Sequence, residues 1–220
     1  MNLGGSIKIN KFAVVLLLLS FVLIIYYISS THNKRELAAK SSKTINLRKL
    51  LIGAIQAAQA GGNQVLKVSQ MQNQEVDIKG KTKEGINDFV TNADLFSHCV
   101  IANGLLRIFP KLNLISEEDI LTKKCPENEF FDLDPTVVKS AELPDSVHSV
   151  EDISVFVDPL DATKEFTEKL FHYVTVMVCV AVKGEPIIGV IHFPFNDKTY
   201  WSWTGTAVSD NLKNIKKVCY

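Results

Sequence analysis

The hydrophobic positions of the 220-residue chain form three patterns: an unbroken apolar run near the start, helix-spaced positions in the middle, and strand-like runs toward the end. The first run, FAVVLLLLSFVLIIYYI at 12–28, contains no charged residue. Its length is at the short end of what crosses a bilayer, and the paired tyrosines suit a membrane interface. We predict a transmembrane signal-anchor at 12–28, between a tail at 1–11 and a polar stem at 29–43. A cleaved signal peptide is the alternative.

The charges beside this run do not decide its orientation. Two lysines precede it and four basic residues follow it: Lys8, Lys11, Lys34, Arg35, Lys40 and Lys43. A membrane-spanning segment is oriented by an excess of basic residues on one side, and neither side has a clear excess here.

The helix-spaced positions predict two helices. The first has a capping-like start at Thr44 and continues past Gly61 and Gly62, where we expect close packing or a kink. The second is expected at 92–109 and is ended by Pro110. The polar, lysine-rich stretch 70–85 between them predicts a loop or a mobile hairpin.

The strand-like runs predict a β-rich second part. Strands are expected at 112–116, 154–157, 173–182, 187–193 and 199–203. The acidic stretch 121–151 contains three prolines and predicts a long surface excursion. Helices followed by a meander of strands indicate a layered α/β or α+β domain covering 44–220.

The composition excludes some functions. Lysine plus arginine and aspartate plus glutamate each number 24, so the formal net charge is zero and we expect no nucleic-acid partner. The four cysteines are widely spaced and form no CxxC pair, which argues against a zinc site. A disulfide stays open, because connectivity cannot be deduced from sequence.

Acidic residues accompany three apolar segments. Asp94 stands in FVTNADLF, Glu117 and Glu118 follow a predicted strand in NLISEED, and Asp158 and Asp161 follow another in VFVDPLDAT. Carboxylates this close repel one another and are partly desolvated at a strand end, so a metal, a lysine or solvent must offset their charge. If the two strands are neighbours, Glu117, Asp158 and Asp161 converge, and such hard oxygen ligands suit magnesium.

The segment 158–163 also predicts local geometry. Pro159 is expected to fix a sharp turn that directs both aspartates into one cavity. The Leu160 carbonyl would be a further oxygen ligand, and Ala162 is small enough for close approach of the backbone. Thr163 would begin a helix and orient a water molecule with its hydroxyl.

Each acidic segment has a plainer explanation when taken alone. Asp158 is then a helix cap, 117–119 a solvated face, and Asp94 a surface residue near a helix start. Their order along the chain favours a joint site.

That order resembles the signature of the inositol monophosphatase superfamily of lithium-sensitive, magnesium-dependent phosphatases. The residues that carry the resemblance are VTNAD at 90–94, SEED at 116–119 and DPLDAT at 158–163. Most members have glycine where Ala162 stands. Alanine there, followed by TKEFTE, is similar to a Golgi-resident branch that acts on adenosine 3′,5′-bisphosphate. The resemblance covers about Ile45 to Trp203 and implies the first half to two-thirds of the inositol monophosphatase fold.

The resemblance also implies roles. Glu117, Asp158, Asp161 and the Leu160 carbonyl would bind two or three Mg²⁺ ions, and Asp94 with Thr163 would activate the water. The reaction would remove the 3′-phosphate and give AMP. The protein would be a single-pass Golgi membrane protein with a lumenal catalytic domain that supports sulfation, and a homodimer is an assembly to test.

The resemblance stops after Trp203. The family's Trp-Asp-x-x-Ala segment, whose aspartate is a further metal ligand, has no counterpart in this sequence. We therefore expect the 220-residue chain to be weakly active or inactive, with part of its sheet uncovered. The alternatives are a phosphatase for inositol phosphates or another small phosphate ester, and an inactive truncated form that binds a metal or a partner.

Overall fold

The computed structural model describes residues 26–27, 43–71, 76–81, 87–118, 125, 130–138 and 143–213. The chain divides into two units, Met1–Ser42 and Lys43–Tyr220, and the second carries nearly all described residues. Within the described residues, no helix is long and apolar enough to cross a membrane. The signal-anchor predicted at 12–28 and the stem at 29–43 lie outside the described part, apart from 26, 27 and 43. They stay predictions.

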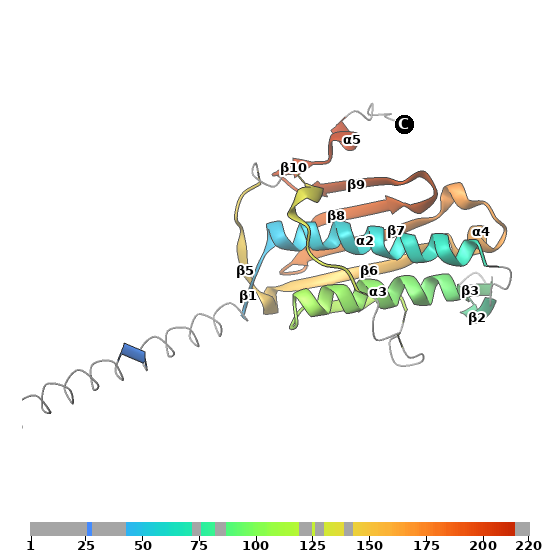
Figure 1. The fold of residues 1–220 in the computed structure, drawn as a ribbon, viewed down its shortest axis with the longest axis horizontal. Helices are drawn as coiled ribbons and strands as arrows, with labels where there is room; N and C mark the ends of the chain where they lie inside the picture. The colour runs from blue at the N-terminus through green and yellow to red at the C-terminus, as the bar shows by residue number, and fades with distance from the viewer. Residues whose placement is uncertain are drawn as a thin grey trace, which may run out of the picture. The chain divides into compact units, whose positions relative to one another are not determined.

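Two long helices, α2 (Leu47–Ser69) and α3 (Asn92–Ile108), lie side by side on one face of a six-stranded sheet (Figure 1). The strand order is β10-β9-β8-β7-β6-β4. The strands are β4 (Asn113–Ser116), β6 (Ile153–Asp161), β7 (Thr175–Val182), β8 (Glu185–Phe193), β9 (Lys198–Trp203) and β10 (Ala207–Val208). All neighbours are antiparallel except β4 and β6, which run parallel. The layered α/β architecture is as predicted.

Smaller elements complete the unit. Strand β1 (Thr44–Asn46) pairs with β5 (Val147–Ser149), and β2 (Val76–Lys81) forms a hairpin with β3 (Asn87–Thr91). The hairpin confirms one of the two alternatives for 70–85. Single turns of helix are α4 (Thr163–Thr167), α5 (Asp210–Lys213) and the 3₁₀ turns η1 (Pro135–Val137), η3 (Val150–Asp152), η4 (Phe171–Tyr173) and η5 (Pro194–Asn196).

The start of α2 differs from the prediction. The helix begins at Leu47, and its cap is Asn46, whose Oδ1 accepts a hydrogen bond from the backbone N–H of Arg48 at 2.9 Å. The predicted start at Thr44 is wrong because residues 44–46 pair with β5 and are extended. Asparagine is among the strongest N-caps, so the helix starts where its first free N–H groups find an acceptor.

Gly61 and Gly62 confirm the expectation of close packing. A Cβ at Gly61 would lie 2.5 Å from Ser97 Oγ on α3, and one at Gly62 would lie 2.4 Å from the His192 ring on β8. Real Cβ atoms do not approach other atoms this closely, so the two glycines let α2 contact both α3 and the sheet.

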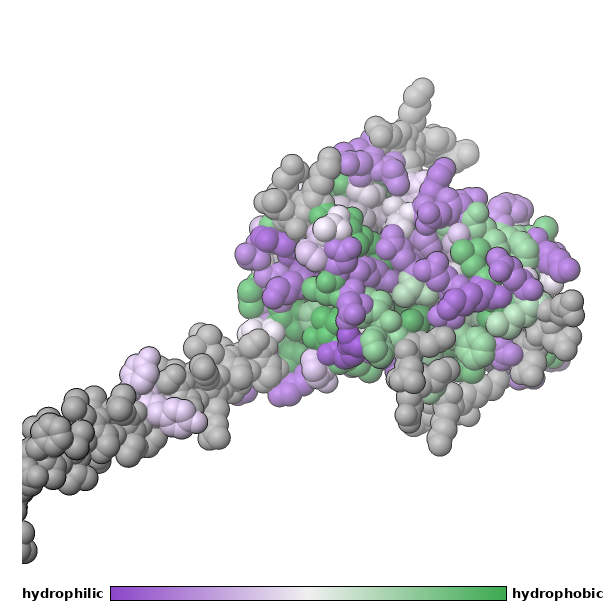
Figure 2. Space-filling view, in the orientation of Figure 1, coloured by the Kyte–Doolittle hydropathy of each residue, from purple (hydrophilic) through white to green (hydrophobic). Residues whose placement is uncertain are grey.

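The two faces of the sheet are treated differently. On β6, the side chains of Ile153, Val155 and Val157 are buried under the helices, whereas Phe156 between them is 44% exposed. Ile115 and Ile191 share that opposite face and are 44% and 40% exposed. The uncovered apolar face matches the expectation for this sheet. Figure 2 shows the helix side, where hydrophilic side chains are interspersed with hydrophobic ones.

The prediction of a surface excursion at 121–151 is only partly right. Among its described residues, Val138 and Leu143 are buried in the core and β5 pairs with β1. The apolar residues of this stretch are scattered among acidic residues and prolines, so their spacing did not indicate buried positions or a strand. Cys125, in the same stretch, forms a disulfide with Cys99 of α3.

Candidate functional site

The parallel pair of β4 and β6 brings two of the acidic segments together. Ser116 is opposite Val157, and the Glu117 N–H donates to the Val157 carbonyl oxygen at 3.0 Å. Because the strands run parallel, their carboxyl ends meet at one edge of the sheet. Glu117 and Asp158, the residues directly after Ser116 and Val157, both lie at this edge. The predicted neighbourhood of these strands is confirmed.

The predicted sharp turn at Pro159 is wrong. β6 continues through Pro159 to Asp161, and its pairing with β7 is irregular between Asp158 and Asp161. Residues three apart on a regular strand point to opposite faces, and a bulge removes that alternation. Ser97 of α3 supports the bulge, since its hydroxyl donates to the Pro159 carbonyl at 2.7 Å. Both aspartates thus reach one pocket, as expected, through a bulge.

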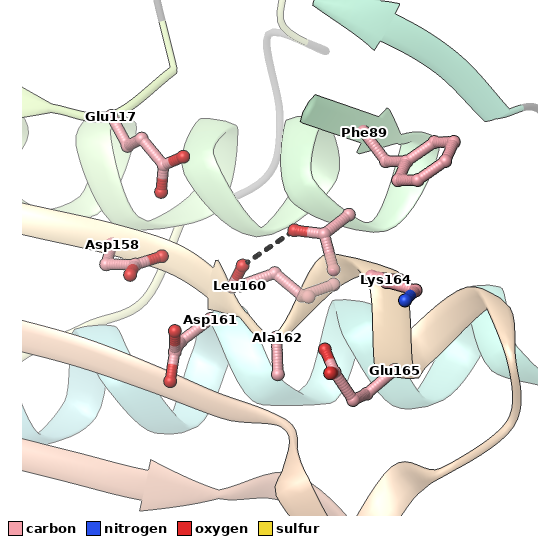
Figure 3. A pocket seen from close by; sticks show the side chains of 9 residues that line it. Phe89, Glu117, Asp158, Leu160, Asp161, Ala162, Lys164 and Glu165 are labelled. Carbon is pink, nitrogen blue, oxygen red and sulfur yellow. Dashed lines mark hydrogen bonds between the residues drawn. The ribbon is translucent and has the colours of Figure 1, made fainter. Parts of the chain in front are cut away.

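A pocket of about 230 Å³ lies at this edge of the sheet (Figure 3). Glu117 and Asp158 lie along one side of it in the figure, and Lys164 and Glu165 of α4 lie on the other. The residues that line it are Phe89, Glu117, Asp158, Leu160, Asp161, Ala162, Thr163, Lys164 and Glu165. Every metal-binding residue predicted from the sequence is therefore at the pocket.

Asp158 carries the strongest electrostatic signal of the pocket. Its burial, the neighbouring Glu117 and the charge of Asp161 raise its pKa from 3.8 to about 7. Its Oδ1 atom is buried without a hydrogen-bond partner. A nearby cation favours the ionised form of a carboxylate that is desolvated and surrounded by other carboxylates.

The donor set of the pocket fits a hard divalent cation. Within the described residues, no three acidic, histidine or cysteine side chains are gathered closely enough to enclose an ion on their own. Carboxylates and the Leu160 carbonyl are the ligand types that magnesium prefers, and magnesium usually keeps several waters. The unpartnered Asp158 Oδ1 is the atom that such an ion would satisfy.

Asp94 and Thr163 form a hydrogen-bonded pair next to the acidic residues of the pocket. The Thr163 hydroxyl is 3.0 Å from Asp94 Oδ1 and 3.2 Å from the Leu160 carbonyl oxygen, and its single proton can be donated to either. Asp94 Oδ2 accepts from the N–H and hydroxyl of Thr91, forming a capping box at the start of α3. Asp94 is 1% exposed, and this burial is the main reason why its pKa is raised to about 6.

Lys79 is a site residue that the sequence analysis missed. From hairpin β2–β3, its ammonium group contacts the carboxylates of Glu117, at 3.4 Å, and Glu118. Burial lowers the pKa of Lys79, but the hydrogen bond to Glu118 and the charges of Glu118 and Glu117 outweigh it, so the net shift is upward. In the sequence, Lys79 is one of several lysines in the polar stretch 70–85, and nothing there indicates which lysine contacts the acidic residues.

Comparison with known proteins agrees with this geometry. The model of the inositol monophosphatase family matches residues 46–217, so the similarity extends beyond Trp203, where the sequence analysis had ended it. The chain belongs to this family. A Drosophila melanogaster protein named "Putative inositol monophosphatase 3" is 49% identical over 96% of the chain. The mouse "Golgi-resident adenosine 3′,5′-bisphosphate 3′-phosphatase" is 36% identical over 81% of it.

The chain spans 61% of that Drosophila relative and 49% of the mouse one. Among solved structures, the extragenic suppressor protein suhB from Bartonella henselae is similar with a TM-score of 0.52 and 23% identity. That match covers 71% of this chain and 50% of the suhB chain, and it supports the inositol monophosphatase-like fold.

Ala162 occupies a conformation that favours glycine. Its φ of 68° and ψ of 47° are left-handed, between the bulge of β6 and the start of α4. A non-glycine residue in this region costs of order 1–3 kcal/mol and persists where the surroundings fix it. This left-handed residue separates Asp161, the last residue of β6, from Thr163, the first residue of α4.

Proposed function

We propose that the chain carries the magnesium site of a phosphatase that hydrolyses the 3′-phosphate of adenosine 3′,5′-bisphosphate to AMP in the Golgi lumen. The observation that supports this most is the convergence of Glu117, Asp158 and Asp161 on one pocket. The Thr163–Asp94 pair lies beside them. A divalent cation would offset the charge of these three carboxylates and would satisfy the buried Asp158 Oδ1, which has no hydrogen-bond partner.

Glu117, Asp158, Asp161 and the Leu160 carbonyl would hold Mg²⁺. When bound, magnesium would lower the pKa of water and offset charge on the phosphate oxygens. Lys79 must then give up part of its contact with Glu117, since the ammonium group and the ion would share that carboxylate.

Thr163 and Asp94 would handle the proton. While the Thr163 hydroxyl donates to Asp94, its free lone pairs can accept a hydrogen bond from the attacking water. Asp94 then accepts the proton passed through that hydroxyl. Its pKa of about 6 lies close to neutral pH, where a general base works best.

The choice of a nucleotide substrate and of the Golgi rests on relatives. The mouse relative is named for the 3′-phosphatase reaction and for its Golgi residence. Ala162 and the predicted anchor at 12–28 add to this. Hydrolysis of an inositol phosphate is the second candidate, because the more similar Drosophila relative bears that name.

Phosphate release by two protein forms tests the proposal. The first form is the full 220-residue chain in detergent. The second joins the matched part of the chain to the part of the Drosophila melanogaster relative that lies beyond the matched segment. Each is assayed with adenosine 3′,5′-bisphosphate and with inositol 1-phosphate, with magnesium or with a chelator. We expect the joined form to release phosphate preferentially from the nucleotide, and the 220-residue chain to be much slower.

In the joined form, Asp158→Asn should lower magnesium-dependent phosphate release at least 100-fold, because it removes a charge at the centre of the acidic cluster. The matched control is Asp132→Asn, at a side chain that is 82% exposed and paired with Arg107 away from the pocket. Equal activity of Asp158→Asn and Asp132→Asn would contradict the proposed site. Preference for inositol 1-phosphate would replace the substrate and leave the site intact.

A further inference from the structure

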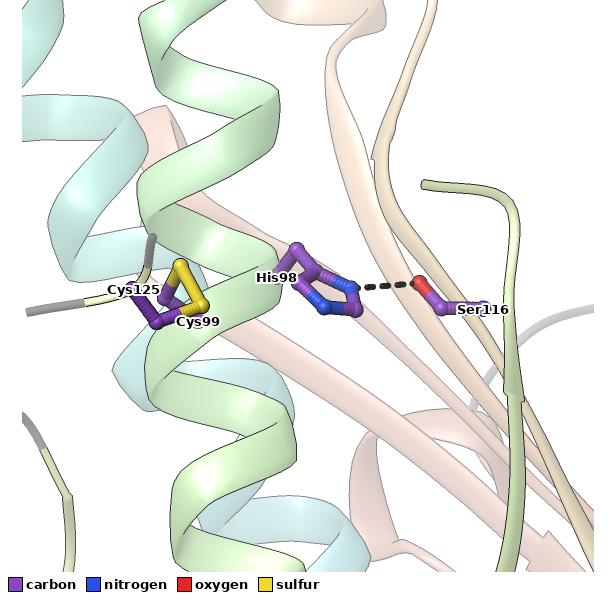
Figure 4. Close-up of a disulfide and its surroundings, with 4 residues drawn as sticks. All are labelled: His98, Cys99, Ser116 and Cys125. Atoms are coloured by element: carbon purple, nitrogen blue, oxygen red, sulfur yellow. Dashed lines mark hydrogen bonds between the residues drawn. A yellow bond between two sulfur atoms is a disulfide. The ribbon is translucent and has the colours of Figure 1, made fainter. Parts of the chain in front are cut away.

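His98 and Cys99, two adjacent residues of α3, bind Ser116 and Cys125, which lie before and after Glu117 in the sequence (Figure 4). His98 Nδ1 is 2.8 Å from the Ser116 hydroxyl, and Cys99 is joined to Cys125 by a disulfide. Ser116 directly precedes Glu117, and Cys125 comes eight positions after it. The stretch that carries Glu117 and Glu118 therefore begins and ends at the same point of α3.

Both anchors are set in the core. His98 is 1% exposed and Cys99 is fully buried, so neither can move without disturbing α3. The second ring nitrogen of His98, Nε2, is buried without a hydrogen-bond partner. Burying a ring nitrogen without a partner costs free energy. Among the described residues, the contact with Ser116 is then the one hydrogen bond of the His98 ring.

The same helix carries Asp94, one turn before His98. Residues four apart lie on one face of a helix, so Asp94 and His98 both face the sheet. α3 thereby fixes the acceptor of the Thr163 hydroxyl on one side and the entry of the Glu117 stretch on the other.

We propose that His98 and the Cys99–Cys125 disulfide are positioning groups that hold Glu117 and Glu118 ready for a divalent cation. Opening the disulfide then weakens cation binding. This inference rests on the proposed function in one respect, namely that the acidic pocket binds such a cation.

The physical basis is preorganisation. Among the described residues, the backbone hydrogen bond from Glu117 to Val157 is the last pairing at the end of β4. Because the disulfide ties Cys125 to α3, the chain between Glu117 and Cys125 has fewer accessible conformations. Carboxylates that are already held in place lose less entropy when an ion binds. Reduction by a dithiol proceeds by thiolate attack on one sulfur. Two electrons pass from the dithiol, both cysteines become thiols and the dithiol becomes a cyclic disulfide.

Calorimetric titration of the full chain in detergent with Mn²⁺, a magnesium substitute, tests the proposal. We expect Cys125→Ser to weaken Mn²⁺ binding three- to tenfold. The matched control Cys179→Ser, at the free thiol on β7, should leave the affinity unchanged. His98→Ala should also weaken binding, and His98→Asn should restore most of it, since an amide can still bond to Ser116.

The unfolding midpoint of the metal-free chain is measured in parallel. A purely structural role lowers that midpoint and leaves Mn²⁺ affinity unchanged in the folded variants, which would overturn the proposal. If Cys125→Ser does not fold, the wild-type chain is reduced with dithiothreitol, and the gain of two thiols is verified before titration. Equal affinity of oxidised and reduced protein overturns the inference alone, whereas absence of Mn²⁺ binding by the oxidised wild-type chain overturns the proposed function as well.

Discussion

Asp94 serves both the fold and the candidate site. One of its carboxylate oxygens caps α3 through Thr91, and the other accepts from Thr163. Burial dominates over these bonds and raises its pKa to about 6, so the neutral acid is favoured in the folded chain up to that pH.

This shift predicts how the stability of the metal-free chain depends on pH. The unfolded carboxyl group ionises near 3.8 and the folded one near 6, so between these values the folded state binds more protons and the free energy of unfolding falls as pH rises. Above about pH 6 this loss is complete. The difference amounts to roughly 3 kcal/mol at 1.36 kcal/mol per unit.

Asp94→Asn should remove that part of the pH dependence. In urea unfolding with a chelator at pH 4.5 and 6.5, the variant should gain about 2 kcal/mol relative to the wild type on going to the higher pH. Parallel curves for the two proteins would show that Asp94 does not titrate in this range.

Single residues were the most predictable level of the site. Carboxylates that end apolar runs are visible in sequence, and Glu117, Asp158 and Asp161 do line one pocket. Lys79 was not predictable, because its role depends on which face of a hairpin meets Glu118. The pairing of Cys99 with Cys125 likewise follows from the path of the chain and not from spacing.

At the scale of elements, the packing of α2 against α3 supports the site indirectly. Gly61 leaves room for Ser97, and Ser97 holds the Pro159 carbonyl inside the bulge of β6. The bulge itself could not be foreseen, since Asp-Pro is equally typical of a turn. Which one forms depends on whether β7 continues to pair beyond Asp158, as it does at Asp161.

Gly61→Ala should therefore destabilise the domain although alanine favours helices by about 1 kcal/mol over glycine. A methyl group would lie 2.5 Å from Ser97 Oγ and 2.7 Å from Ile101 Cδ1, so these side chains, which are buried between α2 and α3, would have to shift. We expect a net loss of about 1–3 kcal/mol in chemical unfolding. Asn63→Ala, at an exposed position of the same helix, should be neutral or stabilising, and the same result at Gly61 would refute the packing argument.

At the scale of the whole domain, the described helices α2 and α3 cover one face of the sheet. Ile115, Phe156 and Ile191 form exposed apolar positions on the other face. These exposed positions agree with the expectation from the sequence that part of the sheet is uncovered. Contiguous exposed apolar residues of this kind promote association.

Phe156→Ser should reduce concentration-dependent self-association of the chain in sedimentation experiments, with a change in stability of no more than about 1 kcal/mol. The neighbouring Val155→Ser is the matched comparison, because Val155 is fully buried under the helices. It should cost about 2–4 kcal/mol through a cavity and a buried hydroxyl. Similar stability losses in both variants would mean that the two faces are equally packed.

The parallel pairing of β4 with β6 has a consequence for the order of folding. β7 and β8 form a hairpin from neighbouring segments, whereas the contact of Asn113 with Ser154 joins residues 41 positions apart. Closing the longer loop costs more chain entropy, so we expect β4 to dock late. Glu117 reaches Asp158 only through that docking. The pocket would then be absent from partly folded chains, and a bound ion would act as a latch on the finished domain and not as a template for its assembly.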